Sequence, residues 1–127
     1  MILADTSIWI DFFRSGNPHM QQKLADDEIA MHPFVAAELA LGSIKSRRKT
    51  LEDLDGLPQV EVAYLDEVRS MIETHKLYSK GIGLTDAHLL ASCLITSGTQ
   101  LWTRDSRLRK VALALGLNAN LPPFAAN

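Results

Sequence analysis

Four acidic residues of this 127-residue chain interrupt or border apolar stretches, and this feature restricts the folds that the chain can adopt. They are Asp5, Glu38, Asp86 and Asp105. An ionised carboxylate is costly to bury, so it normally stays at the surface or acquires a partner. Four such placements suggest one shared partner, and a divalent cation is the obvious candidate.

The composition is that of a globular protein, with 46% hydrophobic and 22% charged residues, which argues against disorder. The length is most simply that of one domain over residues 1–127. A net charge of -2 gives no global attraction to nucleic acid, so any such contact would depend on local basic clusters.

The single cysteine, Cys93, excludes an intramolecular disulfide and a cysteine-rich zinc site. It is most simply a small buried residue, and this usage fits a reducing compartment. No apolar run approaches the roughly 20 residues that cross a bilayer, and Asp5 interrupts any signal-type segment. We therefore expect a soluble cytoplasmic protein.

Strand-like and helix-like segments alternate along the chain. We expect strands at residues 2–4, 28–31, 60–64, 100–103 and 117–121, and helices at residues 6–13, 18–27, 33–41, 46–54, 65–76, 85–96 and 105–115. Asp5, Thr6 or Ser7 would cap the first of these helices, and Thr85 would cap the sixth. This alternation favours a parallel sheet covered by helices on both faces.

The predicted fold makes convergence of the four acids reasonable, because functional groups in open α/β sheets collect beyond the carboxyl ends of the strands. Asp5 and Asp105 each follow a strand, Asp86 lies in the first turn of a helix, and Glu38 lies inside one. Two carboxylates about 5 Å apart repel by roughly 3 kcal/mol at an effective dielectric near 20. Several in one pocket need protonation, hydration or a cation, and an all-oxygen site suits Mg²⁺ or Mn²⁺. Phosphodiester hydrolysis is the reaction most naturally suggested.

Each acid also has a simpler interpretation. Asp5 and Asp105 would serve as helix N-caps, Asp86 would be favoured by the helix dipole, and Glu38 would occupy an ordinary exposed position. The four placements together favour a functional site over four unrelated structural roles.

The ordered segments Asp5-Thr6-Ser7-Ile8-Trp9-Ile10-Asp11, Ala37-Glu38-Leu39, Leu84-Thr85-Asp86-Ala87 and Trp102-Thr103-Arg104-Asp105 resemble the PIN-domain nucleases, and most closely the VapC-type toxins of toxin–antitoxin pairs. The resemblance covers essentially the whole chain. It implies a three-layer α/β/α domain with a central parallel sheet of four to five strands.

The resemblance also implies a site and a reaction. It would place Asp5, Glu38, Asp86 and Asp105 around one or two Mg²⁺ or Mn²⁺ ions, in an endoribonuclease that leaves a 5′-phosphate and a 3′-hydroxyl. Thr6 or Ser7 would bond nearby carboxylates or cap the first helix, and Thr103 would support Asp105. A homodimer and a VapB-type antitoxin are implied too. The antitoxin's C-terminal segment would cover the acidic pocket.

Basic and aromatic residues supply further candidates. Arg104, next to Asp105, is the best single candidate for an RNA phosphate contact, and Arg47 and Arg48 belong to the densest positive segment. Such charge runs are also common on solvated helix faces.

Among the aromatic residues, Trp9, Phe12, Phe13 and Phe34 would either stack on RNA bases or pack in the core. Trp9, Phe13 and Phe34, with Leu41, are also candidates for the walls of an antitoxin groove.

Two alternatives to a ribonuclease remain. The first is a catalytically inactive PIN-like module that binds RNA or protein, and retention of all four acids argues against it. The second is a phosphoryl-receiver domain. That class would need an early acidic pair, but Asp26-Asp27 lies too late and no suitable lysine follows a strand.

Overall fold

The computed structural model describes residues 1–123, and within them three short strands and seven helices form an α/β fold. The elements are β1 (Ile2–Ala4), α1 (Thr6–Ser15), α2 (Pro18–Ala25), β2 (Ile29–Ala30), α3 (Pro33–Ala40), α4 (Arg47–Asp55), α5 (Leu65–Thr74), α6 (Leu84–Ile95), β3 (Gln100–Trp102) and α7 (Ser106–Ala114). Every helix ends within two residues of its expected bounds.

The strands are parallel and lie in the order β2-β1-β3, so β1 is central. Leu3 of β1 pairs with Ala30 of β2 and with Leu101 of β3. The chain leaves β1 toward β2 on one side, and β3 lies on the other side. The carboxyl ends of β1 and β3 therefore flank a switch point of the topology, where α/β proteins place their ligand crevices.

The strand expected at residues 60–64 is reduced to one parallel bridge, between Gln59 and Met31. The backbone N–H of Glu61 donates to the hydroxyl of Thr96 (3.0 Å) rather than to a neighbouring strand. Tyr64 is exposed and serves as the residue before α5. The N–H of Val60 still donates to the carbonyl of Met31 (3.1 Å) at the sheet edge. The prediction of a regular strand was therefore wrong beyond Val60, because the N–H of Glu61 finds its partner outside the sheet.

The strand expected at residues 117–121 is likewise a single parallel bridge, between Asn118 and Leu101. Leu101 donates its N–H to the carbonyl of Leu117 (2.6 Å) and accepts from the N–H of Ala119 (2.8 Å). Both sheet edges are thus extended by one bridged segment. Five parallel segments result, in agreement with the expected four to five.

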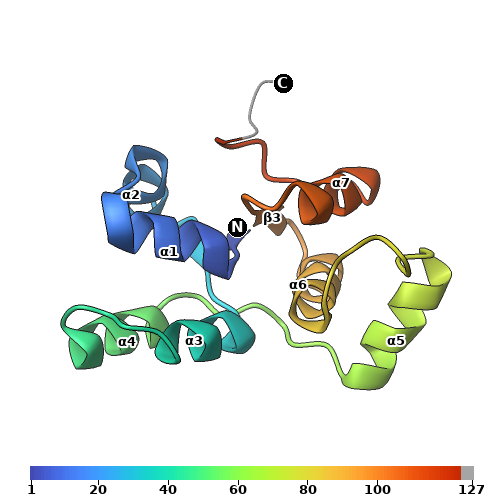
Figure 1. Ribbon diagram of the computed structural model, residues 1–127, viewed down its shortest axis with the longest axis horizontal. Coiled ribbons are helices and arrows are strands. Elements are labelled where there is room, and N and C mark those ends of the chain that lie inside the picture. Colours follow the sequence, from blue (N-terminus) through green and yellow to red (C-terminus); the bar gives the residue numbers. More distant parts are fainter. Residues whose placement is uncertain (124–127) are drawn as a thin grey trace.

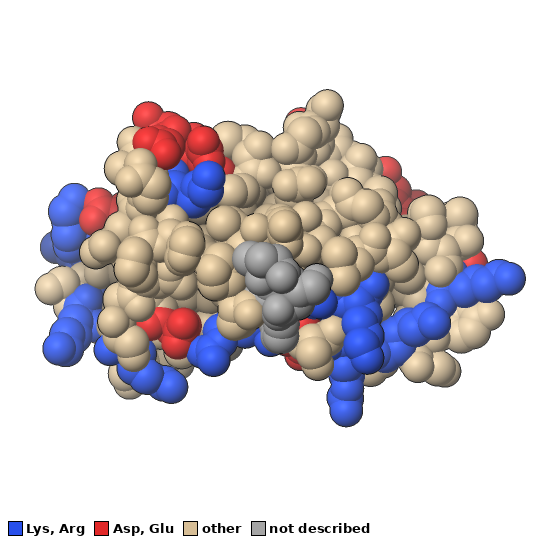
Figure 2. Space-filling view, turned by 90° about the horizontal axis from the view of Figure 1, so that it is seen from above, with Lys and Arg blue, Asp and Glu red and all other residues tan. Residues whose placement is uncertain are grey.

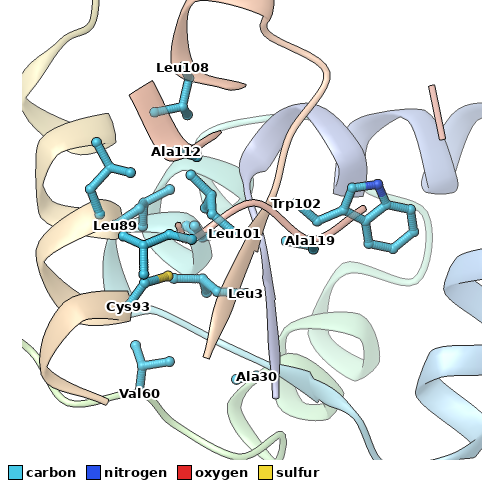
Figure 3. Packing of buried hydrophobic residues seen from close by; sticks show 14 of the residues in the cluster. Leu3, Ala30, Val60, Leu89, Cys93, Leu101, Trp102, Leu108, Ala112 and Ala119 are labelled. Carbon is cyan, nitrogen blue, oxygen red and sulfur yellow. The ribbon is translucent and has the colours of Figure 1, made fainter. Parts of the chain in front are cut away.

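The sheet lies between two helical layers (Figure 1). Helices α1 to α4 lie on one side of it, and α5, α6 and α7 lie on the other. Figure 3 shows Leu89 and Cys93 of α6 pointing toward Leu3 and Leu101 of the sheet. Burial raises the pKa of the Cys93 thiol to about 12, so this cysteine behaves as the small core residue that we expected.

Two of the four acids begin helices. Asp5 is the N-cap of α1 and Asp105 is the N-cap of α7. The expectation that Thr85 caps α6 is wrong, because the helix begins at Leu84 with Gly83 before it. The carboxylate of Asp86 accepts the N–H of Gly83 (3.2 Å), so an acid in the first turn replaces the hydroxyl cap.

Helix α3 is capped by a buried histidine, His32, whose Nδ1 accepts the N–H of Phe34 at 2.9 Å. An imidazole that accepts at Nδ1 is neutral. Burial, with a smaller contribution from the nearby His88, lowers the pKa of His32 from 6.5 to about 4. The cap of the helix that carries Glu38 therefore depends on an unprotonated histidine.

We expect His32 to lower the free energy of unfolding in mild acid. Because its pKa is depressed in the folded state, its contribution is complete above pH 6.5 and is lost as the pH falls toward 4. Between pH 7 and pH 4.5 the wild type would lose roughly 2 to 3 kcal/mol of unfolding free energy more than His32→Asn, which can cap but does not titrate. Urea unfolding of both proteins at the two pH values measures this. Equal losses would contradict it.

Candidate metal centre

The four acids line one hollow of about 220 Å³, together with Thr6, Ser7, Thr85 and Leu89; we call it the acidic hollow. Asp5 enters from the end of β1, Asp105 from the end of β3, Glu38 from α3 and Asp86 from the first turn of α6. The hollow thus lies at the switch point of the sheet, and residues up to 100 positions apart meet there.

Asp5 is the most deeply placed of the four, with 6% of its surface exposed. One carboxylate oxygen accepts from the Ser7 hydroxyl (2.5 Å) and the Ile8 N–H (3.2 Å), and the other accepts from the Thr103 hydroxyl. Burial raises the pKa of Asp5, these three hydrogen bonds oppose the rise, and the charge of Asp86 adds to it. The carboxylate is therefore fixed in place but poorly solvated.

Glu38 and Asp86 each commit one oxygen to the protein. Thr6 donates its hydroxyl to Oε1 of Glu38 (2.6 Å), and Gly83 donates its N–H to Oδ2 of Asp86 (3.2 Å). No hydrogen bond within residues 1–123 occupies the second oxygen of either side chain. Each acid is therefore oriented by one contact and keeps an oxygen for a ligand.

Asp105 combines the capping role with a place in the acidic hollow. Its Oδ1 accepts the N–H groups of Arg107 (2.8 Å) and Leu108 (3.0 Å). Its own N–H donates to the hydroxyl of Thr103 (3.0 Å), which also holds Asp5. Thr103 therefore links two of the acids, and the capping interpretation and the site interpretation of Asp105 are compatible.

The acids repel one another in the hollow. Burial raises the pKa of Asp86, and the charges of Asp105 and Glu38 raise it further. In the described residues no group of three or more His, Cys, Asp or Glu side chains is preassembled to hold a metal ion. Mg²⁺ is commonly held by one or two carboxylates with several waters, so the hollow, with its free oxygens, fits a hydrated hard cation.

Among the basic candidates, Arg104 lies closest to the acids. Its Nη1 forms an ion pair with Asp11 of α1 (2.8 Å), and its backbone N–H donates to the Ser7 hydroxyl (3.1 Å). Neither Asp11 nor Arg14 was predicted as a site residue, although the two lie one turn apart on the face of α1 that carries Ser7. That helical spacing is the signal that could have identified them.

Arg47 and Arg48 lie at the start of α4 and face different surroundings. The guanidinium of Arg47 donates to the carbonyls of Ala40 (2.6 Å) and Gly42 (3.3 Å), at the end of α3. Arg48 pairs with Glu52 at 3.5 Å on an open surface. Neither side chain lines the acidic hollow.

Figure 2 shows basic side chains gathered along one edge of the molecule with acidic ones among them, while the centre of this face carries few charges. The positive side chains thus form local clusters on a protein whose net charge is -2.

A second hollow of about 530 Å³ adjoins the first at Glu38; we call it the apolar hollow. Ile10, Phe13, Leu39 and Ile44 contribute apolar walls. Three of the four expected wall residues do not line this hollow. Trp9 is buried in the core, and the ring of Phe34 packs on that of His88 at 4.4 Å. Leu41 lies outside the hollow with 88% of its surface exposed.

Within residues 1–123 no helix has the length and apolar character that a membrane crossing requires.

Residues 2–114 match the family described as PIN domain. Ribonuclease VapC32 of Mycobacterium tuberculosis, found in the strains CDC 1551 / Oshkosh and ATCC 25618 / H37Rv, is 43% identical over 117 residues. The match covers 92% of this chain and 94% of that protein.

Proposed function

The chain belongs to the PIN-domain family, in its VapC branch, and from this premise we propose that it is a metal-dependent endoribonuclease, the toxin of a toxin–antitoxin pair. The relative named as a ribonuclease spans nearly the same length, so residues 1–127 would act as one PIN-like domain. The observation that carries the proposal is the convergence of Asp5, Glu38, Asp86 and Asp105 on one hollow.

Each acid has a role in this proposal. Asp5, Glu38 and Asp86 would hold one or two Mg²⁺ or Mn²⁺ ions directly or through water, and Asp105 would do so through its second oxygen. When bound, such an ion would lower the pKa of a water so that it can act as a nucleophile at neutral pH, and would supply positive charge to stabilise the phosphate. The protein would contribute orientation. Ser7 and Thr103 fix the carboxylate of Asp5, and Thr6 fixes that of Glu38.

RNA would be held by positive groups beside the acids. Arg104 is the nearest of the candidates, because Ser7 accepts its backbone N–H. Arg48 remains available on an open surface of α4, whereas Arg47 already caps the end of α3. We therefore propose Arg104 as the main phosphate contact, with Arg47 and Arg48 as outer contacts.

The experiment is to incubate the purified protein with total RNA and Mg²⁺ and to determine the chemistry of the new ends. The proposal predicts a 5′-phosphate and a 3′-hydroxyl, because water rather than the 2′-hydroxyl attacks. A 2′,3′-cyclic phosphate would contradict it. RNA binding without cleavage across many substrates would instead support a catalytically inactive RNA-binding module.

The same family membership supports a VapB-type antitoxin as the partner, a homodimer as the assembly and the cytoplasm as the location. We propose that the antitoxin's C-terminal segment occupies the apolar hollow, which adjoins the acidic hollow at Glu38. An occupant there would block access to the acids. Ile10 and Phe13 line this hollow and expose 42% and 39% of their surfaces, so both can make apolar contacts with an occupant.

Phe13→Asp would weaken inhibition by the antitoxin while RNA cleavage continues. The substitution places a charge in the apolar hollow and touches none of the four acids. We expect at least a tenfold rise in the antitoxin concentration that halves cleavage, since burying an unpaired charge costs several kcal/mol. Titration of both proteins with antitoxin measures it. Unchanged inhibition would place the antitoxin elsewhere.

A further inference from the structure

A third hollow, of about 470 Å³, adjoins the acidic hollow; we call it the arginine hollow. Ser7, Ile10, Asp11, Arg14, Arg104 and Asp105 line it. It shares Ser7 and Asp105 with the acidic hollow, so the two are separated by no more than those side chains. An RNA strand with one phosphate at the acids can therefore place a neighbouring nucleotide beside this hollow.

Arg104 is held in the arginine hollow from two directions. Asp11 binds its Nη1 at 2.8 Å, and Ser7 accepts its backbone N–H at 3.1 Å. The guanidinium carries five N–H donors, and about half of the side chain (49%) remains exposed. One edge of the planar group is therefore fixed, and other donors remain for a phosphate, which guanidinium groups bind well.

Arg14 supplies a second positive charge. It lies on α1 one turn beyond Asp11 and Ile10, and it borders both the arginine hollow and the apolar hollow. No acidic partner within 4.0 Å is found for it in the part of the chain that the structure describes. Its charge is thus available to a ligand, whereas that of Arg104 is partly offset by Asp11.

The charges of the hollow fit a single phosphodiester. Arg14 and Arg104 contribute two positive charges, and Asp11 and Asp105 contribute two negative charges. Asp105 also lines the acidic hollow, where a bound cation would offset its charge, and without it one positive charge remains for a phosphate. We propose that the arginine hollow binds the RNA phosphate next to the scissile one, with Arg14 and Arg104 as its contacts and Asp11 as the residue that positions Arg104. This inference rests on the proposed ribonuclease function.

The test measures RNA binding and its salt dependence. A fluorescent RNA that the wild type cleaves is titrated with Asp5→Asn protein, which leaves it intact, at several KCl concentrations. Adding Arg14→Gln or Arg104→Gln would weaken binding about tenfold, as expected for a lost charged hydrogen bond. Log affinity falls as log salt rises, and each substitution would make this dependence less steep by about 0.7, the value for one phosphate contact to a single strand.

Arg69→Gln on α5 is the matched control, since it removes the same charge from a residue that lines none of the three hollows. It should leave affinity and slope unchanged. Asp11→Asn makes the hollow more positive, so simple attraction predicts tighter binding. The positioning role predicts the opposite, a weakening of about threefold, because Arg104 loses the partner that fixes it.

The outcomes separate the two proposals. If the wild type cleaves RNA but Arg14→Gln and Arg104→Gln keep its affinity and salt slope, the phosphate site is wrong and the ribonuclease stands. Tighter binding by Asp11→Asn would refute the positioning role. Without cleavage by the wild type, the proposed function itself fails. Arg14→Gln keeps the test valid even if Arg104→Gln unfolds, because Arg14 forms no hydrogen bond or ion pair through its side chain within residues 1–123.

Discussion

Asp5→Asn should reduce RNA cleavage at least about 1,000-fold, equivalent to roughly 4 kcal/mol of transition-state stabilisation. Asp5 is the most buried of the four acids, and its carboxylate accepts from Ser7, Ile8 and Thr103. The amide has nearly the same shape, so the surrounding structure can persist. It carries no charge, however, and the affinity of the acidic hollow for a cation would fall sharply.

The control is Asp55→Asn, which makes the same chemical change at an exposed residue at the end of α4. It should cleave like the wild type. Urea unfolding of both variants distinguishes a lost site from a lost fold. Cleavage by purified Asp5→Asn at the wild-type rate would show that another site, or another protein in the sample, is responsible.

Removal of divalent cations should have a comparable effect. Chelation with EDTA is expected to stop cleavage, and Mg²⁺ or Mn²⁺ added in excess should restore it, because carboxylates and water are the preferred ligands of these ions. Binding should also be visible without any reaction. A cation at 100 times its dissociation constant stabilises the fold by about 2.7 kcal/mol.

That stabilisation should disappear in Asp5→Asn and persist in Asp55→Asn. Thermal unfolding with and without Mg²⁺ gives the answer for each protein. Full cleavage in EDTA, or equal stabilisation of all three proteins by Mg²⁺, would show that the acidic hollow is not where a required cation binds.

The seven helices and the three central strands could be predicted because their signals are local. Apolar residues at helical spacing indicate where the helices lie. Their ends are marked by residues such as Pro33 at the start of α3 and Gly116 after α7, and the structure has these helix ends where the sequence predicts them. The edge segments could not be predicted in the same way. Alternating apolar residues at 60–64 look like a strand, but the partners of their N–H groups, such as Thr96, are set by the tertiary structure.

The convergence of the four acids was predictable in outline, because parallel strands bring Asp5 and Asp105 to one edge of the sheet. Their detailed contacts were not. Thr103 was expected to support Asp105, yet its hydroxyl also holds Asp5 across 98 residues. The Asp11–Arg104 pair spans 93 residues and leaves no pattern in the sequence. Such pairings depend on how close two loops approach, which local spacing does not encode.

The most direct test of the metal centre is diffraction from crystals containing Mn²⁺, recorded where manganese scatters anomalously. We predict an anomalous peak in the acidic hollow, next to Asp5, Glu38 and Asp86, in the wild type and its absence in Asp5→Asn crystals of the same form. A hollow without a peak in the wild type, at a Mn²⁺ concentration that supports RNA cleavage, would contradict the account.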